Sequence, residues 1–222
     1  MEKSAVFNKG LKEIQNKVLA MGDMVTKEIS KSIEALKARD LKMAHQIIAD
    51  DTKIDNARFA IEDRCIELMG VPKLTVADRR VIVSLLSIST ELERIGDYAE
   101  GIAKIVVMIG DEPPLKPLID IPRMAELTVE MINKSLKSFV DRDVELARHV
   151  VTIDNLVDGL YDQVFRELLT FMMIDPKTIN RATRLMWVAH NLERAADRVT
   201  NICERVVFTV TGKMEDLEIS KY

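Results

Sequence analysis

An acidic pair with a spacing of four residues occurs four times in this 222-residue chain, and the last two pairs repeat the first two about 100 positions further on. On an α-helix this spacing is one turn, so the two carboxylates of a pair lie on one face. Like charges placed in this way destabilise an isolated helix by roughly 0.2–0.5 kcal/mol per pair. The duplicated set therefore predicts a helical chain that uses these pairs to hold something positively charged. The pairs are Asp51 and Asp55, Glu93 and Asp97, Asp154 and Asp158, and Glu193 and Asp197.

The composition also favours long helices over sheets. Only 8 Gly and 6 Pro occur, and only 5% of the residues are aromatic. Leu, Ile, Val, Met, Ala, Glu and Lys dominate, and most of these are good helix formers, whereas sheets are rich in aromatic residues. We therefore expect an all-α protein.

Proline marks a joint between two similar halves. Half of the prolines fall between Gly110 and Pro117, a stretch that must interrupt a helix and predicts a linker. Two further breaks in each half leave three helical segments per half. We predict two tandem three-helix bundles related by an internal repeat, covering residues 1–110 and 123–222, with a proline-rich joint at 111–122. The further breaks are at Arg39-Asp40, Gly70-Val71-Pro72, Asp141-Arg142-Asp143 and Asp175-Pro176.

The acidic pairs lie beside the apolar stripe of each predicted helix. In the third segment of each half, apolar residues alternate by three and four positions, and Leu92 and Leu192 belong to these stripes. Because each residue turns the helix by about 100°, the glutamate that follows each leucine lies off the stripe. The pairs of the second segment flank their stripes in the same way. We therefore expect two acidic ridges to face each other across a groove in each half.

Clusters made only of carboxylates suit hard cations. Magnesium, calcium, manganese and oxidised iron prefer oxygen ligands, whereas thiolates and imidazoles favour zinc or copper. Four carboxylates on two adjacent helices supply enough charge for more than one cation. Glu100 and Asn201 offer further oxygens one to two turns from the pairs, and they form a second tier of candidate metal ligands.

Other roles for the carboxylates remain open. Acidic residues on a helix flank are often solvated, and Arg94, Arg194 and Arg198 are close enough in sequence to neutralise some of the charge. A metal-independent acidic adaptor that binds a basic partner surface would use the same ridges, and its binding would weaken with salt. A metal-dependent phosphohydrolase or oxidase is disfavoured, because the chain has only 3 histidines and lacks a recognisable nucleophile or phosphate-binding loop.

Charge, hydropathy and cysteine usage narrow the class further. The net charge of −4, with both signs interspersed, argues against nucleic acid as a partner. The longest apolar stretches, 81–86 and 102–109, are shorter than the roughly 20 residues that span a bilayer, so we expect a soluble, cytoplasmic chain without membrane insertion. Cys65 and Cys203 lie within amphipathic patterns, which predicts buried, reduced thiols. Trp187 is predicted to be a packing residue.

Two segments, 91–103 and 191–202, resemble the duplicated E-R-x-G-D-x-x-x-N-I motif of the PhoU family of bacterial phosphate-transport accessory and regulatory proteins. The likeness extends over nearly the whole chain, including the proline-containing joint and the D-x-x-x-D pairs. The chain departs from the motif at Gly101, where the motif has Asn, and at Ala196, where it has Gly. We expect the first departure to remove a side-chain contact at the first site, and the second to narrow the space beside the second site.

The resemblance implies a cytoplasmic, all-helical, non-enzymatic regulator. Members of the PhoU family restrain the phosphate-starvation response together with the ATPase and permease of the phosphate ABC transporter and a membrane-bound sensor histidine kinase, and they often form homodimers. They bind multinuclear metal clusters through these motifs, which implies hard-metal clusters here, iron first, with manganese, magnesium or zinc as alternatives. By position, the implied metal ligands are Asp51, Asp55, Glu93 and Asp97 in the first half and Asp154, Asp158, Glu193 and Asp197 in the second.

Overall fold

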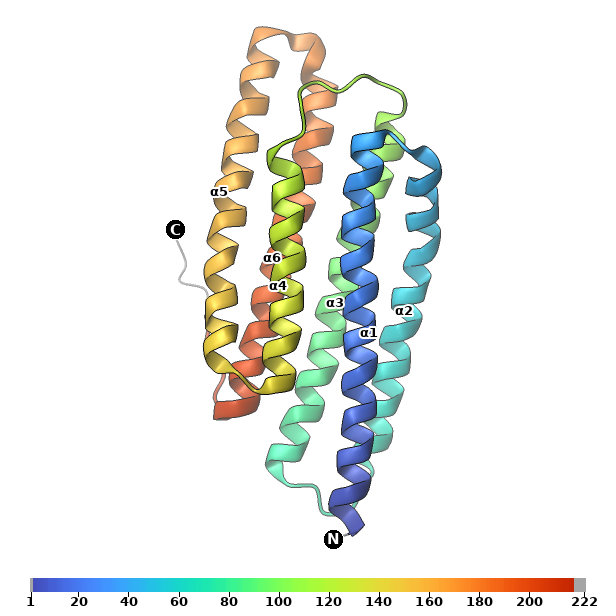
Figure 1. The fold of residues 1–222 in the computed structure, drawn as a ribbon, viewed down its shortest axis with the longest axis vertical. Helices are drawn as coiled ribbons and strands as arrows, with labels where there is room; N and C mark the ends of the chain where they lie inside the picture. The colour runs from blue at the N-terminus through green and yellow to red at the C-terminus, as the bar shows by residue number, and fades with distance from the viewer. Residues whose placement is uncertain (1, 218–222) are drawn as a thin grey trace.

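The structure, a computed structural model, describes residues 2–217, with side chains from residue 5 onward. Within these residues the chain forms six α-helices and no strand, which confirms the predicted all-α fold of two three-helix repeats (Figure 1). A single turn of 3-10 helix, Pro176–Thr178, precedes the last α-helix. The α-helices are α1 (Glu2–Ala38), α2 (Leu41–Met69), α3 (Val76–Ile109), α4 (Asp120–Asp141), α5 (Val144–Ile174) and α6 (Ile179–Thr211).

The same Arg-Asp dipeptide turns the chain between the first two helices of each half. Arg39 and Arg142 adopt left-handed backbone conformations, with φ of 55° and 57°. Asp40 and Asp143, which follow them, each cap the next helix with a side chain that accepts a hydrogen bond from the backbone amide three residues on. Such a cap stabilises a helix by about 1 kcal/mol. The breaks expected at these two places are therefore encoded locally.

The proline-rich joint crosses from one half to the other and is tied to the second half. α3 ends at Ile109 and is followed by its C-cap, Gly110, which has a φ of 61°, a backbone angle that glycine adopts without steric penalty. Glu112, two residues later, forms an ion pair with Arg184 of α6, with Oε1 and Nη1 3.1 Å apart. α4 begins at Asp120, within the stretch that the sequence predicts to be the joint.

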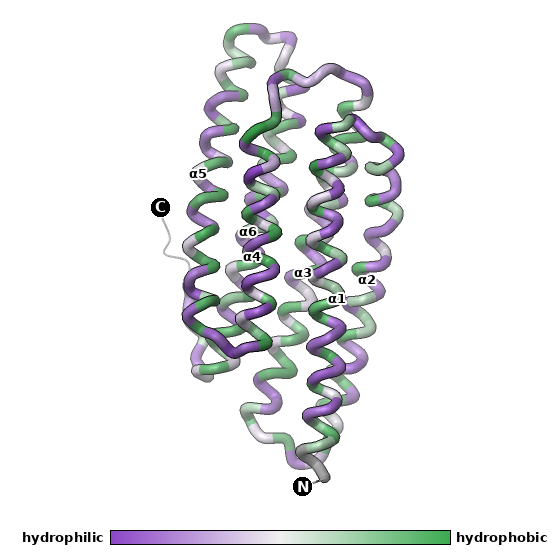
Figure 2. The backbone as a smooth tube through the Cα atoms, viewed as in Figure 1, coloured by the Kyte–Doolittle hydropathy of each residue, from purple (hydrophilic) through white to green (hydrophobic). Residues whose placement is uncertain are grey.

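α3 and α6 lie at the centre of the molecule and run antiparallel to each other (Figure 1). α1 and α2 pack on α3, α4 and α5 pack on α6, and α1 also contacts α4. The stripe residues Leu92 and Leu192 are fully buried, and the buried apolar side chains of both halves form one continuous core. Figure 2 shows the alternation of hydrophilic and hydrophobic residues along each helix that this packing requires. The two helices that carry acidic pairs in each half are therefore direct neighbours.

The structure bears on the predictions for the two cysteines, for Trp187 and for a membrane-spanning helix. Cys65 and Cys203 are buried and form no disulfide, as predicted. The prediction for Trp187 is wrong, because its side chain is 51% exposed. Trp187 precedes the buried stripe residue Val188 by one position and so points about 100° away from the core. Among the described helices, none has an apolar stretch long enough to cross a membrane.

Candidate metal sites

The acidic pairs lie on α2 and α3 in the first half and on α5 and α6 in the second, and each of these helix pairs is packed together. They lie beside the core, as their phase on the helices predicts. Asp154 is buried, Asp97 is exposed, and the other six carboxylates are half-buried. Partial burial matters because a carboxylate that has lost some of its water gains more from a bound cation than a fully solvated one does.

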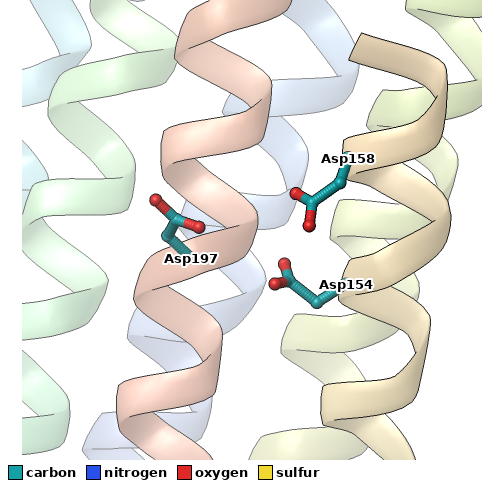
Figure 3. Close-up of side chains that lie close together, drawn as sticks. All are labelled: Asp154, Asp158 and Asp197. Carbon is teal, nitrogen blue, oxygen red and sulfur yellow. The ribbon is translucent and has the colours of Figure 1, made fainter. Parts of the chain in front are cut away.

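The second half brings three of its four predicted ligands together. Asp154 and Asp158 on α5 and Asp197 on α6 each offer one carboxylate oxygen, and these oxygens all lie within 4.8 Å of one another. Figure 3 shows Asp154 and Asp158 projecting from α5 toward α6, which carries Asp197. A set of oxygens alone fits a hard cation such as Mg²⁺, Mn²⁺ or oxidised iron, with water completing the coordination shell.

Glu193, the fourth predicted ligand of the second half, lies one helical turn before Asp197. Its Oε2 is 3.4 Å from Nδ1 of His190. Burial, followed by the charge of Arg194, lowers the pKa of His190, so this imidazole is neutral at pH 7 and does not compete as a cation for Glu193. Glu193 is not part of the three-carboxylate group, and its role as a ligand stays a prediction.

The first half holds a larger but looser set of carboxylates. Burial, followed by the charges of Glu100, Asp55 and Asp97, raises the pKa of Asp51 to about 6. Burial and the charge of Asp97 also raise the pKa of Glu93. These five groups are therefore close enough to repel one another. Within the described residues, however, only the second half brings three such oxygens within 4.8 Å.

Basic side chains pair with two carboxylates of the first half. Nε of Arg58 lies 3.3 Å from Oε1 of Glu93, and Nζ of Lys104 lies 2.5 Å from Oε2 of Glu100. In the second half the repeat position of Arg58 is taken by the uncharged Tyr161. A metal at the first site must therefore displace Arg58 before Glu93 can coordinate it.

The two second-tier candidates lie in different places. Glu100 belongs to the first carboxylate set, whereas Nδ2 of Asn201 donates a hydrogen bond over 3.3 Å to Oε2 of Glu91, across the contact between α3 and α6. At Gly101, the repeat position of Asn201, a Cβ would lie 3.1 Å from Oδ1 of Asn191, so glycine makes room for a side chain of α6. These positions join the two halves, and metal ligation by Asn201 remains untested.

Gly96 and Ala196 differ because their neighbours differ in size. A Cβ on Gly96 would lie only 2.9 Å from Cδ1 of Ile54 on α2, and 3.8 Å from Oδ1 of Asp51. In the second half, Val157 stands at the repeat position of Ile54 and has one carbon fewer. The extra methyl group of Ala196 is thus offset in volume by the smaller valine. Gly96 lets α2 and its aspartates approach α3 closely.

The motif analysis missed Glu28 of α1, which is only 8% exposed. Burial, followed by the charges of Asp51 and Asp50, raises its pKa to about 7. The signal that could have found it is the internal repeat, because the second half has the fully buried Met131 at the same position. A glutamate at a position where the repeat packs an apolar side chain indicates a special role.

Arg194 connects the second site to the other half of the molecule. Its Nη1 lies 2.9 Å from Oδ2 of Asp197. A hydrogen bond to Tyr98 of α3, together with the charge of Asp197, raises the pKa of Arg194. The guanidinium therefore neutralises part of the charge that would otherwise attract a metal.

Replacing Arg194 by glutamine is expected to tighten Mn²⁺ binding at the second site by about threefold to tenfold, because the cation no longer has to displace a guanidinium from Asp197. Isothermal titration calorimetry with Mn²⁺ at low salt measures this change. The matched control is Arg148→Gln, which breaks an ion pair with Glu215 and should leave the affinity unchanged. Weaker binding by the Arg194 variant would show instead that Arg194 holds Asp197 in place for the metal.

Comparison with known proteins agrees with this architecture. The family model described as PhoU domain matches residues 18–106 and again residues 121–206. The phosphate-specific transport system accessory protein PhoU homolog of Aquifex aeolicus is 39% identical over 186 residues, covering 84% of each chain. The homolog of Clostridium acetobutylicum is 37% identical over 213 residues, covering 96% of this chain and 97% of that protein. The crystal structure of the phosphate transport system regulatory protein PhoU from Streptococcus pneumoniae has a TM-score of 0.88 at 31% identity and covers 95% of this chain and 99% of that one.

The fold and the carboxylates together define a class of duplicated, all-helical proteins that carry one acidic set per half. The relatives at this level of identity are accessory and regulatory proteins of phosphate transport. The chain belongs to the PhoU family.

Proposed function

We propose that this chain is a metal-binding, non-enzymatic regulator of phosphate uptake that negatively regulates the phosphate-starvation response. The observation that carries the proposal is the group formed by Asp154, Asp158 and Asp197, whose oxygens lie within 4.8 Å of one another. This group occurs on a fold whose relatives are named for the phosphate-specific transport system. A site of this kind binds a cation without needing a nucleophile or a general base.

Multinuclear clusters of a hard metal suit the two carboxylate sets, iron first, with manganese, magnesium or zinc as alternatives. A bound cation supplies positive charge that neutralises partly buried carboxylates. In the second half, Glu193 is the fourth proposed ligand, beside the three aspartates. In the first half, Arg58 has to move away from Glu93 before this carboxylate can bind the metal. The residues that hold the metal are Asp51, Asp55, Glu93 and Asp97, with Glu100 in the second tier, and Asp154, Asp158, Glu193 and Asp197.

The proposed partners are the ATPase or permease of the phosphate ABC transporter and a sensor histidine kinase, which the chain contacts in the cytoplasm as a homodimer. Nucleic acid and membrane insertion play no part in this proposal. The names of the relatives support a role beside the transporter. Exposed apolar side chains on the second half offer contact area for a protein partner, among them Trp187 at 51%, Met173 at 84% and Ile174 at 78% exposure.

A metal-independent adaptor is the second candidate function. The ion pairs Arg58–Glu93 and Arg194–Asp197 favour it, because they show that these carboxylates accept protein cations as well as metals. Binding of a basic partner by the adaptor would fall steeply with salt and be indifferent to a chelator. Binding by the metal-loaded regulator would be lost on chelation.

The cellular test replaces the relative of a host bacterium with this chain and measures phosphate uptake in phosphate-rich medium. Asp154→Asn combined with Asp158→Asn is expected to release uptake from repression, and deletion of the whole chain is expected to do the same. The matched control is Asp162→Asn, an exposed acid on the same helix, which should leave repression intact. Full repression by the double variant would remove the second site from the regulatory mechanism.

A further inference from the structure

A polar cleft lies between α1 and α2, and no residue of the four acidic pairs lines it, although Asp50 of the cleft precedes Asp51 in the chain. Glu28 lines this cleft, is 8% exposed, and has an Oε2 atom that no described residue hydrogen bonds. A buried carboxylate oxygen without a hydrogen-bond donor is unfavourable, because it has lost its water and gained no partner. Such a group is informative when it lines a space that a ligand can enter.

The cleft has a volume of about 170 Å³. On the same measure a water molecule needs roughly 10–15 Å³, so the cleft has room for a small anion together with water. Three lysines line it, of which Lys53 is held by Asp50, with Nζ and Oδ1 2.7 Å apart. Within residues 5–217, Lys27 and Lys31 of α1 form no ion pair within 4.0 Å, although the charge of Lys31 acts on Glu28 and Asp50. Two ammonium groups and one carboxylate are thus available to a ligand.

The second half shows that the fold does not require these polar residues. The repeat position of Glu28 is Met131 and that of Asp50 is Ile153, and both are buried apolar side chains. The repeat position of Lys53 is Leu156. The second half therefore buries apolar side chains where the first half has Glu28 and Asp50, while it keeps a lysine, Lys134, at the repeat position of Lys31. The difference points to binding rather than to packing.

The arrangement of donors and acceptors selects the ligand. The two lysines donate hydrogen bonds and attract an anion, whereas Glu28 needs a donor. An oxyanion that keeps a proton near neutral pH satisfies both, because its bare oxygens accept from the lysines and its hydroxyl donates to Glu28. Inorganic phosphate keeps such a proton, whereas a phosphate monoester, whose second pKa is about 6, has lost its last proton above neutral pH. Sulfate has none and would set an oxygen lone pair against the carboxylate.

We propose that the cleft between α1 and α2 binds a protonated phosphate group, with Lys27 and Lys31 on its oxygens and Glu28 accepting a hydrogen bond from its hydroxyl. This site deepens the proposed function, on which its regulatory meaning rests, by adding a direct ligand to a regulator of phosphate uptake. It shares no lining residue with the acidic pairs, but the charge of Asp51 acts on Glu28, so metal content is measured together with phosphate binding.

The test is isothermal titration calorimetry of the full chain with inorganic phosphate, glycerol phosphate and sulfate at matched ionic strength, with and without chelator. At pH 8, where Glu28 is charged, inorganic phosphate is expected to bind, whereas sulfate and glycerol phosphate, which carry no proton, are not. Glu28→Met, which copies the second half, and Lys31→Gln should each weaken phosphate binding about tenfold or more, the effect of losing a charged hydrogen bond. The control Lys134→Gln, at the repeat position of Lys31, should bind as the wild type does.

Wild-type affinity in Glu28→Met, or equal binding of sulfate, would overturn the site. Phosphate binding that is abolished by chelator would also overturn it, because the ligand would then belong to the metal. Binding of glycerol phosphate as tight as that of inorganic phosphate at pH 8 would also overturn the site, because the ester has no proton to donate to Glu28. Metal content measured on the same samples tests the proposed function separately, since Glu28→Met should retain the metal of the wild type.

Discussion

Removal of bound cations by a chelator is expected to lower the Tm of this chain by about 10 °C. A cation that binds only the folded state, at a free concentration about 1,000 times its Kd, contributes about 4 kcal/mol to the free energy of unfolding. For a chain of this size, each kcal/mol shifts Tm by about 2–4 °C. The physical cause is the burial of these carboxylates, followed by repulsion among them, which together raise the pKa of Asp51, Glu93 and Asp97. Differential scanning calorimetry at pH 7.5, before and after dialysis against chelator, measures the shift.

The control for this prediction removes the proposed ligands. A chain that carries Asp51→Asn, Asp97→Asn, Asp154→Asn and Asp158→Asn should show no response to chelator, because its sites no longer bind. Its Tm should also be higher than that of the wild type after treatment with chelator, because it has fewer carboxylates that repel one another. An unchanged Tm in the stripped wild type would mean that cations contribute nothing to this fold.

Replacing Glu28 by methionine is expected to raise the free energy of unfolding by about 1–3 kcal/mol at pH 8 in phosphate-free buffer. The pKa of Glu28 is about 7 in the folded chain against an ordinary value of 4.5. Folding therefore disfavours the charged form, and the free energy of unfolding of the wild type falls as pH rises from about 4.5 to about 7. At pH 4 the carboxyl of Glu28 is protonated in both the folded and the unfolded chain. The increase in the free energy of unfolding that comes from removing the charge should therefore disappear at this pH. Chemical denaturation across this pH range measures it.

The internal repeat supplies the reciprocal control. Met131→Glu places a glutamate at the same position of the second half, where the side chain is fully buried, and should lower the free energy of unfolding at pH 8 more than at pH 4. A Glu28→Met variant that is less stable than the wild type at pH 8 would contradict the account, because it would show that the carboxylate makes a favourable contact in the folded chain.

Local signals explain how much of the fold could be predicted from the sequence. The repeated Arg-Asp turns are specified by a left-handed residue and a capping aspartate, as Asp40 and Asp143 show. The stripe through Leu92 specifies which face is buried, and therefore places the acidic pairs beside the core. These features depend on residues within one or two turns of each other, which is why periodicity and spacing reveal them.

Contacts between distant helices could not be predicted in this way. The pairing of Arg58 with Glu93 depends on how α2 crosses α3, and the hydrogen bond of Asn201 to Glu91 depends on how the halves join. The sequence shows eight equivalent ligand positions, yet only the second half gathers three oxygens within 4.8 Å among the described residues. Glu28 escaped notice because its neighbours in space lie on another helix.

Metal content per chain, measured by plasma mass spectrometry on untagged protein purified without added metal, tests the central claim most directly. The wild type is compared with Asp51→Asn/Asp55→Asn, with Asp154→Asn/Asp158→Asn and with the exposed-acid control Asp63→Asn/Asp162→Asn. We predict a stoichiometric hard cation in the wild type and the control, and loss of one half's metal in each of the other two variants. A wild type that holds no metal even after reloading with iron and manganese would contradict the claim and leave the acidic pairs as a surface for a basic partner.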